Sequence, residues 1–230
     1  MAVTERAGPV GRRGPRRRRD PERSRKAILD AAEEAFAQHG YGGASLAAIA
    51  EAAAVSTALP AYFFDSKAKL YAAVVERLFR ERNERLDGLG RAAVAEVDGT
   101  EEGLRRGLRV LIGGYLDFLL SRPNFVQLMT RDALALAGKG RAQAPRHSTA
   151  YEDGVRGFLA ALSPPPGPAV DSSQLLVSIV AMCFFPLEHD ATMVAGMGLR
   201  AWTPAFIGQR TEHVVDLLVR VLKPDQHPRR

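Results

Sequence analysis

The chain has 230 residues, of which 46% are hydrophobic and 25% are charged, the balance of a globular protein with a sizeable core. Its single cysteine, Cys183, excludes an internal disulfide and a cysteine-based metal cluster, so a reducing cytoplasm is the simplest location. The longest apolar run, residues 175–187, is too short to cross a bilayer, and we predict neither a membrane span nor a secretion signal.

Positive charge is concentrated near the N-terminus. Residues 1–20 hold seven arginines against Glu5 and Asp20, whereas the remaining 210 residues carry a net charge of only +1. A cationic arm on a nearly neutral body favours a polyanionic partner, although a solubilising tail explains the composition equally well. An anionic membrane surface is a weaker alternative, because no amphipathic or lipid-modified segment accompanies the arm. Residues 1–19, rich in Gly, Pro and Arg, are predicted to be disordered without a partner.

Apolar residues recur with a helical period almost throughout the chain, beginning with three helices near the N-terminus. A residue that suits an N-cap precedes each of the first four predicted helices. In chain order these residues are Asp20, Ser45, Ser56 and Ser66. Gly40 ends the first helix, a turn at Ala54 and Val55 follows the second, and the third ends near Phe63. Residues 20–66 are therefore predicted to form a small three-helix domain.

A long fourth helix is predicted from Lys67 to about Asp87, where Gly88 and Gly90 end it. Its buried stripe is expected to contain Leu70, Val74, Leu78 and Phe79. Further helices, separated by breaks rich in proline or glycine, are expected at about residues 101–121, 123–137, 148–162, 171–188 and 207–222. The predicted fold is all-α, with a three-helix head, a connecting helix, a helical body within residues 67–223 and a frayed tail, 224–230.

An ordered series of short motifs crosses the predicted second and third helices. In chain order the motifs are Gly40-Tyr41, Ser45, Ile49-Ala50, Ala53-Ala54-Val55-Ser56, Tyr62-Phe63-Phe64, Ser66-Lys67 and Leu70. This series resembles the signature of the TetR family of transcriptional regulators. The resemblance implies a DNA-binding helix-turn-helix, a homodimer, and a body that binds a small, mainly apolar effector, with repression as the usual outcome.

Two positions depart from the family pattern. Ala54 stands where the family usually has glycine, and it would be strained if the turn requires a positive φ. Pro60 lies four residues after Ser56, where it would remove a helical hydrogen bond and crowd the preceding turn. We therefore expect the contacts made at positions 60 and 61 to differ from those of the family.

The third helix suits the major groove of DNA because its outward side chains are short. Thr57 can hydrogen-bond a base or a phosphate, and three apolar residues can pack on thymine methyl groups: Ala58, Leu59 and Ala61. No Arg, Asn or Gln on this helix can make bidentate base contacts, so we expect modest direct readout of the sequence. A tightly packed helix crossing is the alternative explanation for the small residues.

Phosphate contacts are predicted from the helix starts, from Tyr62 and from the arm. The N-termini behind Ser45 and Ser56 favour an anion, and Lys67 adds a point charge in the first turn of the fourth helix. The arm arginines nearest the first helix are predicted to touch the DNA backbone or minor groove: Arg16, Arg17, Arg18 and Arg19. Alternatively, the two serines only cap helices and Tyr62 only packs on the rim of the head. Phe64 is expected in the core.

The body is rich in apolar and aromatic side chains, most of which must be core. The family resemblance implies an effector cavity among them, for which the candidate walls are Tyr115, Phe118, Met129, Phe158, Met182 and Phe185. Arg131 or Glu188 is the candidate polar anchor.

Two segments, 171–188 and 207–222, are apolar on more than one side and should be buried both within the chain and against a partner. The resemblance also implies a two-fold four-helix interface, for which the candidates are Leu175, Leu176, Ile179, Val214, Leu217, Leu218 and Val221. Such a dimer would place its two heads about 34–36 Å apart, on successive major grooves of a palindromic operator.

No catalytic motif is present, and the five histidines lack metal-ligand spacing, so we predict neither an enzyme nor a cofactor or metal site. Cys183 has no basic neighbour in sequence and is expected to be a buried core residue rather than a redox sensor. The alternatives to a ligand-responsive regulator are an all-helical enzyme with an incidental arm and an architectural protein that binds DNA constitutively.

Overall fold

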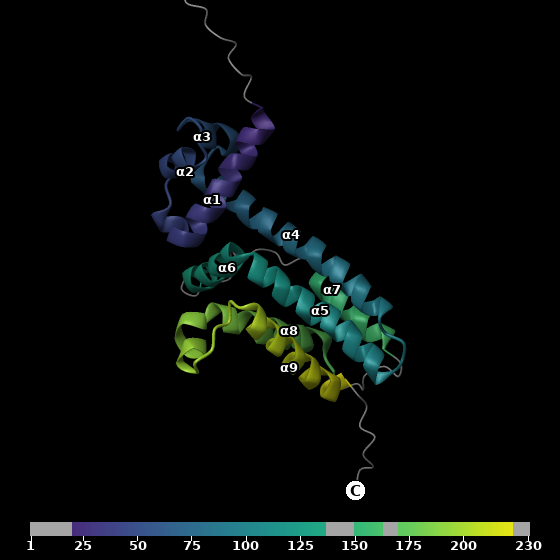
Figure 1. Cartoon of the computed structure of the whole chain (residues 1–230). Coiled ribbons are helices and arrows are strands. Elements are labelled where there is room, and N and C mark those ends of the chain that lie inside the picture. The colour runs from purple at the N-terminus through teal and green to yellow at the C-terminus, as the bar shows by residue number, and fades with distance from the viewer. Residues whose placement is uncertain (1–19, 137–149, 163–169, 223–230) are drawn as a thin grey trace, which may run out of the picture.

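The computed structural model describes residues 20–136, 150–162 and 170–222, and within them the chain is helical without a strand (Figure 1). The helices are α1 Pro21–Gly43, α2 Leu46–Ala52, α3 Leu59–Phe64, α4 Lys67–Ala95, α5 Glu101–Ser121, α6 Pro123–Leu136, α7 Ala150–Ala161, α8 Ser172–Glu188 and α9 Pro204–Leu222, with a π-helical turn η2 Asp190–Val194. The predicted all-α class, with a small head of α1 to α3 and a larger helical body, is confirmed. The predictions for the arm, 1–19, and for the tail, 224–230, lie outside the described residues.

Three of the four predicted N-caps act as such. Each accepts a backbone N–H from the first turn of its helix, at 3.1 to 3.2 Å: Asp20, Ser45 and Ser66. Ser56 caps no helix, because α3 starts only at Leu59. Pro60 explains the late start, since proline suits the first turn of a helix, where its missing N–H would have no partner anyway. Pro60 therefore stands in the first turn of α3, and the turn before it, which it was expected to crowd, is not part of the helix.

The predicted helix break at Gly88 and Gly90 is wrong. The helix α4 continues past Gly88 and Gly90 to Ala95, because its far end packs in the body, where Ala93 is fully buried. Glycine within a helix costs only about 1 kcal/mol, which tertiary packing offsets. The helix α8 runs through Pro186 to Glu188, in agreement with the helix predicted over residues 171–188.

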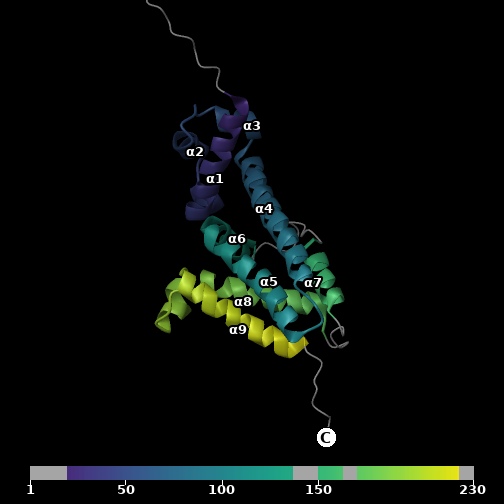
Figure 2. The ribbon, with the colours of Figure 1, turned by 45° about the vertical axis from the view of Figure 1, so that its right-hand side comes forward.

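The continuation of α8 depends on a side chain from α9. Proline has no N–H, so Pro186 leaves the carbonyl of Met182, four residues earlier, without its helical donor. The guanidinium of Arg210 fills this role, with its Nε 2.9 Å from that carbonyl oxygen. The helix α9 passes in front of α8 in the view of Figure 2, and the hydrogen bond from Arg210 joins the two helices at the carbonyl that the proline leaves without a donor.

One core runs from the head into the body along α4. The predicted stripe of Leu70, Val74 and Leu78 is buried, and Phe79 packs beside it. The most deeply buried helix of the body is α5, whose inward side chains have exposed fractions of 1% or less: Leu108, Ile112, Leu116 and Leu119. Cys183 is also fully buried, as predicted, and burial raises the pKa of its thiol to about 12, so it is unreactive at neutral pH.

Candidate nucleic-acid interface

The helices α2 and α3 are joined by a tight turn at the C-terminus of α2. The N–H of Val55 donates to the carbonyl of Ala50 at 3.0 Å, and the N–H of Ala54 donates to that of Glu51 at 2.9 Å. This pair of bonds is a Schellman motif, which places the residue after the cap in the left-handed region. Ala54 has a φ of 52°, so the strain expected of alanine at a glycine position is present. The turn directs the chain from α2 into α3.

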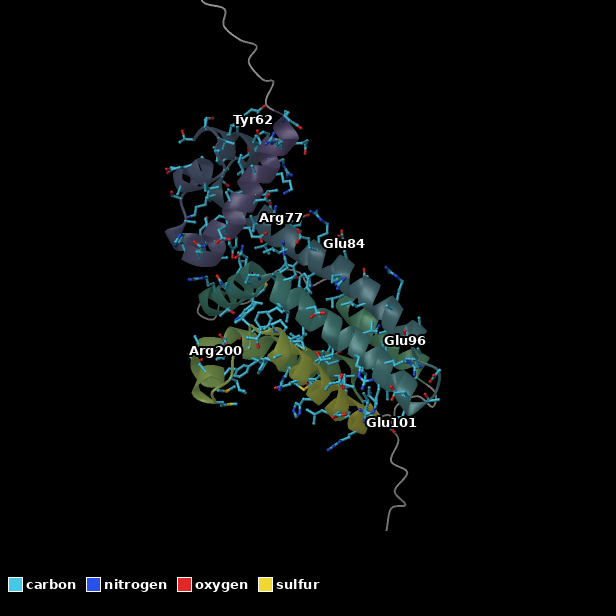
Figure 3. The ribbon with its side chains drawn as sticks, viewed as in Figure 1. Tyr62, Arg77, Glu84, Glu96, Glu101 and Arg200 are labelled. Atoms are coloured by element: carbon cyan, nitrogen blue, oxygen red, sulfur yellow. The ribbon has the colours of Figure 1, made fainter. Side chains whose placement is uncertain are left out.

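The outer surface of α3 and of the residues before it carries mostly short side chains. The exposed members of the predicted set are Ser56, Thr57, Ala58, Ala61 and Tyr62. Tyr62 is 77% exposed and points away from the body at the far end of the head (Figure 3). Leu59 differs from the prediction, because it is half-buried and packs on the head core. Pro60 and Phe64 are buried on the inner side, as was expected of Phe64.

Lys67, the first residue of α4, is held in place by Tyr41, a member of the motif series that was not predicted as a site residue. Its Nζ lies 4.7 Å from the centre of the Tyr41 ring. That ring packs on Phe36 and Tyr71, with centroids 6.3 and 5.3 Å away. A cation–π contact of this kind keeps the ammonium at one place on the surface. The Gly40-Tyr41 motif was the available signal, since the break at Gly40, with a φ of 67°, turns the chain toward Lys67.

The folded part of the head is acidic. Residues 20–66 contain three basic residues and seven acidic ones. A surface of this sign does not attract DNA by itself, so phosphate affinity must come from elsewhere in the chain. The four arginines predicted to touch DNA, Arg16 to Arg19, lie outside the described residues.

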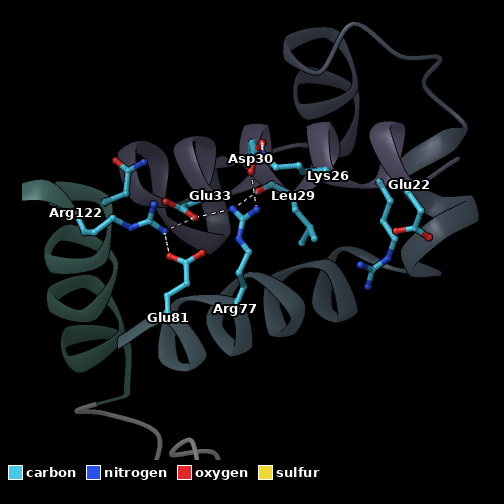
Figure 4. Close-up of a pocket in the computed structure, with 10 residues that line it drawn as sticks. Glu22, Lys26, Leu29, Asp30, Glu33, Arg77, Glu81 and Arg122 are labelled. Carbon is cyan, nitrogen blue, oxygen red and sulfur yellow. Dashed lines mark hydrogen bonds and ion pairs between the residues drawn. The ribbon is translucent and has the colours of Figure 1, made fainter. Parts of the chain in front are cut away.

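Part of this acidity is neutralised where the head meets the body (Figure 4). Arg77 of α4 lies 2.6 Å from a carboxylate oxygen of Asp30 and 2.6 Å from one of Glu33, both on α1. Although burial lowers the pKa of Arg77, its hydrogen bonds to Asp30 and Glu33 raise it above the ordinary value. Arg122 lies 3.6 Å from Glu33 and also pairs with Glu81. The two arginines and three carboxylates join α1, α4 and the start of α6.

Residues 28–74 match the family profile of bacterial regulatory proteins of the tetR family. The match covers the core of α1, all of α2 and α3, and the start of α4. The chain therefore carries the N-terminal segment of this family. Proteins of this family generally act by binding DNA rather than by catalysis.

Solved structures share the fold of this chain over most of its length. The transcriptional regulator SCO4942 from Streptomyces coelicolor is 24% identical with a TM-score of 0.58, over 84% of this chain and 97% of that one. A TetR-like regulator from Rhodococcus sp. RHA1 is 21% identical with a TM-score of 0.57, over 86% and 93%. FadR from Bacillus subtilis, solved with stearoyl-CoA, is 16% identical with a TM-score of 0.54, over 83% and 97%. No curated protein matches the chain.

The body holds a small apolar cavity between α4, α5, α7 and α8. Its volume is about 40 Å³, and its lining is Leu86, Gly90, Leu111, Tyr115, Gly154, Val155, Leu176 and Ile179. A wider opening of about 440 Å³ shares Gly90 and Gly154 with it and is lined further by Asp87, Arg91, Val94, Gly157 and Phe158. Of the predicted effector contacts, Tyr115 lines the cavity and Phe158 the opening. Phe118, Met129 and Met182 line neither, and they pack in or against the core.

Three predicted effector contacts are placed elsewhere by the fold. Arg131 reaches from α6 to the carbonyls of Ala37 and Gln38 at the end of α1, at 2.8 Å each. Phe185 is 42% exposed and stacks on His189 outside the body core. Glu188 is exposed at the end of α8. The sequence pattern shows whether such a position is apolar or polar. What its side chain contacts depends on how the neighbouring helices pack.

The predicted dimer contacts divide into two groups. Ile179, Val214 and Leu218 are buried within the monomer, which leaves them little surface for a partner. Leu175 and Leu176 are half-buried and also pack on the core. Large apolar side chains on the outer surfaces of α8 and α9 include two from the predicted set, Leu217 at 39% and Val221 at 57% exposed, and two new ones, Val177 at 61% and Phe185. We call these four residues the outer apolar face.

Among the described residues, no helix is both long and apolar enough to span a bilayer. Nor do three His, Cys, Asp or Glu side chains of the described part of the chain gather where they could hold a metal ion.

Proposed function

We propose that this chain is a cytoplasmic, homodimeric repressor that binds a palindromic operator and is released by a small, mainly apolar effector. The observation that carries the DNA-binding part is the exposed row of short side chains at and before α3, within the segment that matches the family profile. Side chains this short let the helix backbone approach base edges in the major groove.

The charge distribution divides the work of DNA binding between two parts of each subunit. The folded head has an excess of acidic residues, whereas residues 1–19 contain seven arginines and a single acidic residue. We infer that the arm supplies most of the attraction to DNA phosphates and that α3 determines where on the DNA sequence the head binds. Thr57 and Tyr62 reach bases or backbone oxygens, and Lys67, steadied by Tyr41, adds one phosphate contact beside them.

The test is a binding titration with a labelled duplex that covers the region upstream of the chain's own gene. A random duplex of equal length is the competitor, and both are measured at several salt concentrations. We expect preferential binding of the upstream duplex, and a Thr57→Ala, Tyr62→Ala double variant should lose most of that preference while keeping its helicity. Purified protein that ignores both duplexes even at low salt would refute the proposal.

The effector part of the proposal rests on the cavity in the body and its opening. A volume of about 40 Å³ is far below the several hundred Å³ of a typical ligand site, so the effector must enlarge the cavity when it enters. The effector therefore prefers the state of the body in which the cavity is enlarged. Such a preference is required of a switch, because a ligand shifts an equilibrium between two states only if it binds one of them better. A long acyl chain is a sensible first probe, since FadR from Bacillus subtilis, which shares the fold, was solved with stearoyl-CoA.

The opening suggests where such a probe enters. A Cβ atom built on Gly90, Gly154 or Gly157 would meet nothing within 4 Å, so these glycines leave open space between α4 and α7. Arg91 stands at the rim, where an anionic end group would remain in water. We infer that the apolar part of the effector passes between these two helices toward Tyr115.

Gly90→Leu tests the entrance because Gly90 lines the opening and a Cβ atom there has free space around it. Gly88→Leu is the matched control, since Gly88 lies on the same helix, also has open space, and does not line the opening. With palmitate and stearoyl-CoA as probes, we expect Gly90→Leu to weaken probe-induced release of DNA at least about tenfold, equivalent to about 1.4 kcal/mol. Equal responses of the two variants to a probe that releases the wild-type protein would reject this entrance.

The homodimer is supported by the outer apolar face. Its four large side chains lie on helices that are already joined to each other through Arg210, which gives a partner copy a preformed surface. A two-fold axis beside α8 and α9 would cover these side chains with the same residues of a second chain.

A further inference from the structure

One arginine of α6, Arg131, contacts the head by replacing helical hydrogen bonds that are missing at the end of α1. The break at Gly40 ends the regular part of α1, so the carbonyls of the preceding turn lose donors from the next turn. Arg131 supplies two of them, with Nε 2.8 Å from the carbonyl oxygen of Ala37 and Nη2 2.8 Å from that of Gln38. Its positive charge also lies at the negative end of the α1 dipole.

Gly40 contributes to this contact in two ways. Its break in α1 frees the carbonyls to which Arg131 donates, and its lack of a side chain leaves room for the guanidinium. A Cβ at position 40 would lie 3.8 Å from Nη1 and 4.0 Å from Cδ of Arg131, and the positive φ there favours glycine independently. The end of α1 and the guanidinium of Arg131 therefore fit together at close range. Two further contacts bring α1 to the start of α6, from Asn124 to Glu34 at 2.8 Å and from Arg122 to Glu33.

The opposite side of α6 is part of the body core. Phe125 is 3% exposed, and its ring meets Phe118 of α5 and Phe79 of α4, with centroids 5.5 and 6.2 Å away. Val126 and Leu128 are buried beside it. A change in the packing of α4 and α5 therefore reaches α6 through Phe125, and it reaches α1 through Arg131.

We propose that Arg131 is a positioning residue that fixes the angle of the DNA-binding head on the body and passes rearrangements of the body core to α1. The proposal rests on the DNA-binding function inferred above, and it adds the contact through which the body controls the head. Arg131 faces the end of α1 that is remote from Tyr62, so it touches no DNA itself. Its contribution to DNA affinity is therefore through orientation.

The first measurement follows the head directly and needs neither DNA nor effector. Exposed Ala52 in α2 and exposed Ala205 in α9 are changed to cysteine and spin-labelled, while the fully buried Cys183 stays unlabelled. Labelled protein is diluted into excess unlabelled full-length protein, and the distance distribution between the labels is recorded. We expect Arg131→Ala to broaden or shift the distribution and Arg131→Lys to restore it in part, because lysine keeps the charge but lacks the two-pronged donor.

The matched control is Arg106→Ala. Arg106 also donates to a main-chain carbonyl, that of Glu96 at 3.4 Å, and it also forms an ion pair with the Glu96 side chain. Glu96 lies at the end of the body far from the head (Figure 3). Arg106→Ala should leave the distance distribution unchanged even if it lowers the melting temperature. Circular dichroism of each variant shows whether the fold is retained, and Arg131→Lys remains informative if Arg131→Ala does not fold.

The second measurement is affinity for the upstream duplex. We expect Arg131→Ala to weaken binding about threefold to tenfold with an unchanged salt slope, because Arg131 neutralises no phosphate. An unchanged distance distribution in Arg131→Ala overturns the proposal, as does a wild-type affinity. If the wild-type protein fails to bind DNA at all, the proposed function fails, and the distance measurement still decides the role of Arg131.

Discussion

The head and the body offer opposite kinds of surface to their proposed partners. The outward residues of α3 are short or polar, and the folded head around them is acidic, so its affinity for DNA depends on the arginines of residues 1–19. The outer face of α8 and α9 instead exposes large apolar side chains such as Val177 and Val221. Phosphate contacts weaken steeply with salt, whereas burial of apolar area does not. DNA binding should therefore weaken as the salt concentration rises, whereas dimerisation through the outer apolar face should change little.

Removal of residues 1–19 should have the largest effect. We expect DNA affinity at physiological salt to fall about a hundredfold or more, and the dependence of log affinity on log salt to flatten by about 0.9 for each phosphate that the arm no longer neutralises. Anisotropy titrations from about 50 to 300 mM salt measure both quantities. Removal of residues 223–230, which include three basic residues, is the control and should change little. An unaltered slope in the protein without residues 1–19 would show that the head binds DNA without help from the arm.

A Leu217→Glu, Val221→Glu variant should have the next largest effect, and on the body alone. Each substitution places a charge where we propose that a partner helix lies, so we expect the dimer dissociation constant to rise about a hundredfold. Sedimentation equilibrium at low and high salt measures it, and the rise should persist in both. Gln209→Glu, at another exposed position of α9, is the control. A variant that remains a dimer would move the interface away from the outer apolar face.

The hydrogen bond from Arg210 to Met182 gives a smaller effect, within the body. Arg210→Met leaves that carbonyl without a donor and should lower the free energy of unfolding by about 1–2 kcal/mol. In a Pro186→Ala background the alanine N–H can donate to the same carbonyl, so the decrease should shrink by about 1 kcal/mol. Urea unfolding of the four proteins completes the cycle. Equal decreases in both backgrounds would mean that the proline and the arginine are independent.

The smallest effect is expected at the turn between α2 and α3. Ala54→Gly should raise the free energy of unfolding by about 0.5–1 kcal/mol, because glycine adopts the positive φ of this position without strain. Ala53→Gly is the control and should lower it by a similar amount, since Ala53 has a φ of −77°. Thermal unfolding measures both. If the two substitutions act alike, the strain assigned to Ala54 is absent.

The prediction of the head succeeded where a signal was local, and it failed where packing intervened. Asp20, Ser45 and Ser66 each bind the first turn of their own helix, so a side chain and the residues just after it suffice to mark the start. Ser56 has the same chemistry but caps nothing, because Pro60 moves the start of α3. The Tyr41 contact with Lys67 joins positions 26 apart in sequence, and no local pattern indicates it.

In the body, the sequence by itself determined which segments are helical and which side chains are apolar. It did not determine what each apolar side faces, because the core, a cavity and a partner all select the same residue types at the same spacing. Only the packing of α8 and α9 assigns Val214 to the core and leaves Val221 outside, and only the end of α1 makes Arg131 a donor to its carbonyls. Local hydrogen bonds act within one turn of a helix, whereas these assignments depend on the arrangement of separate helices in space.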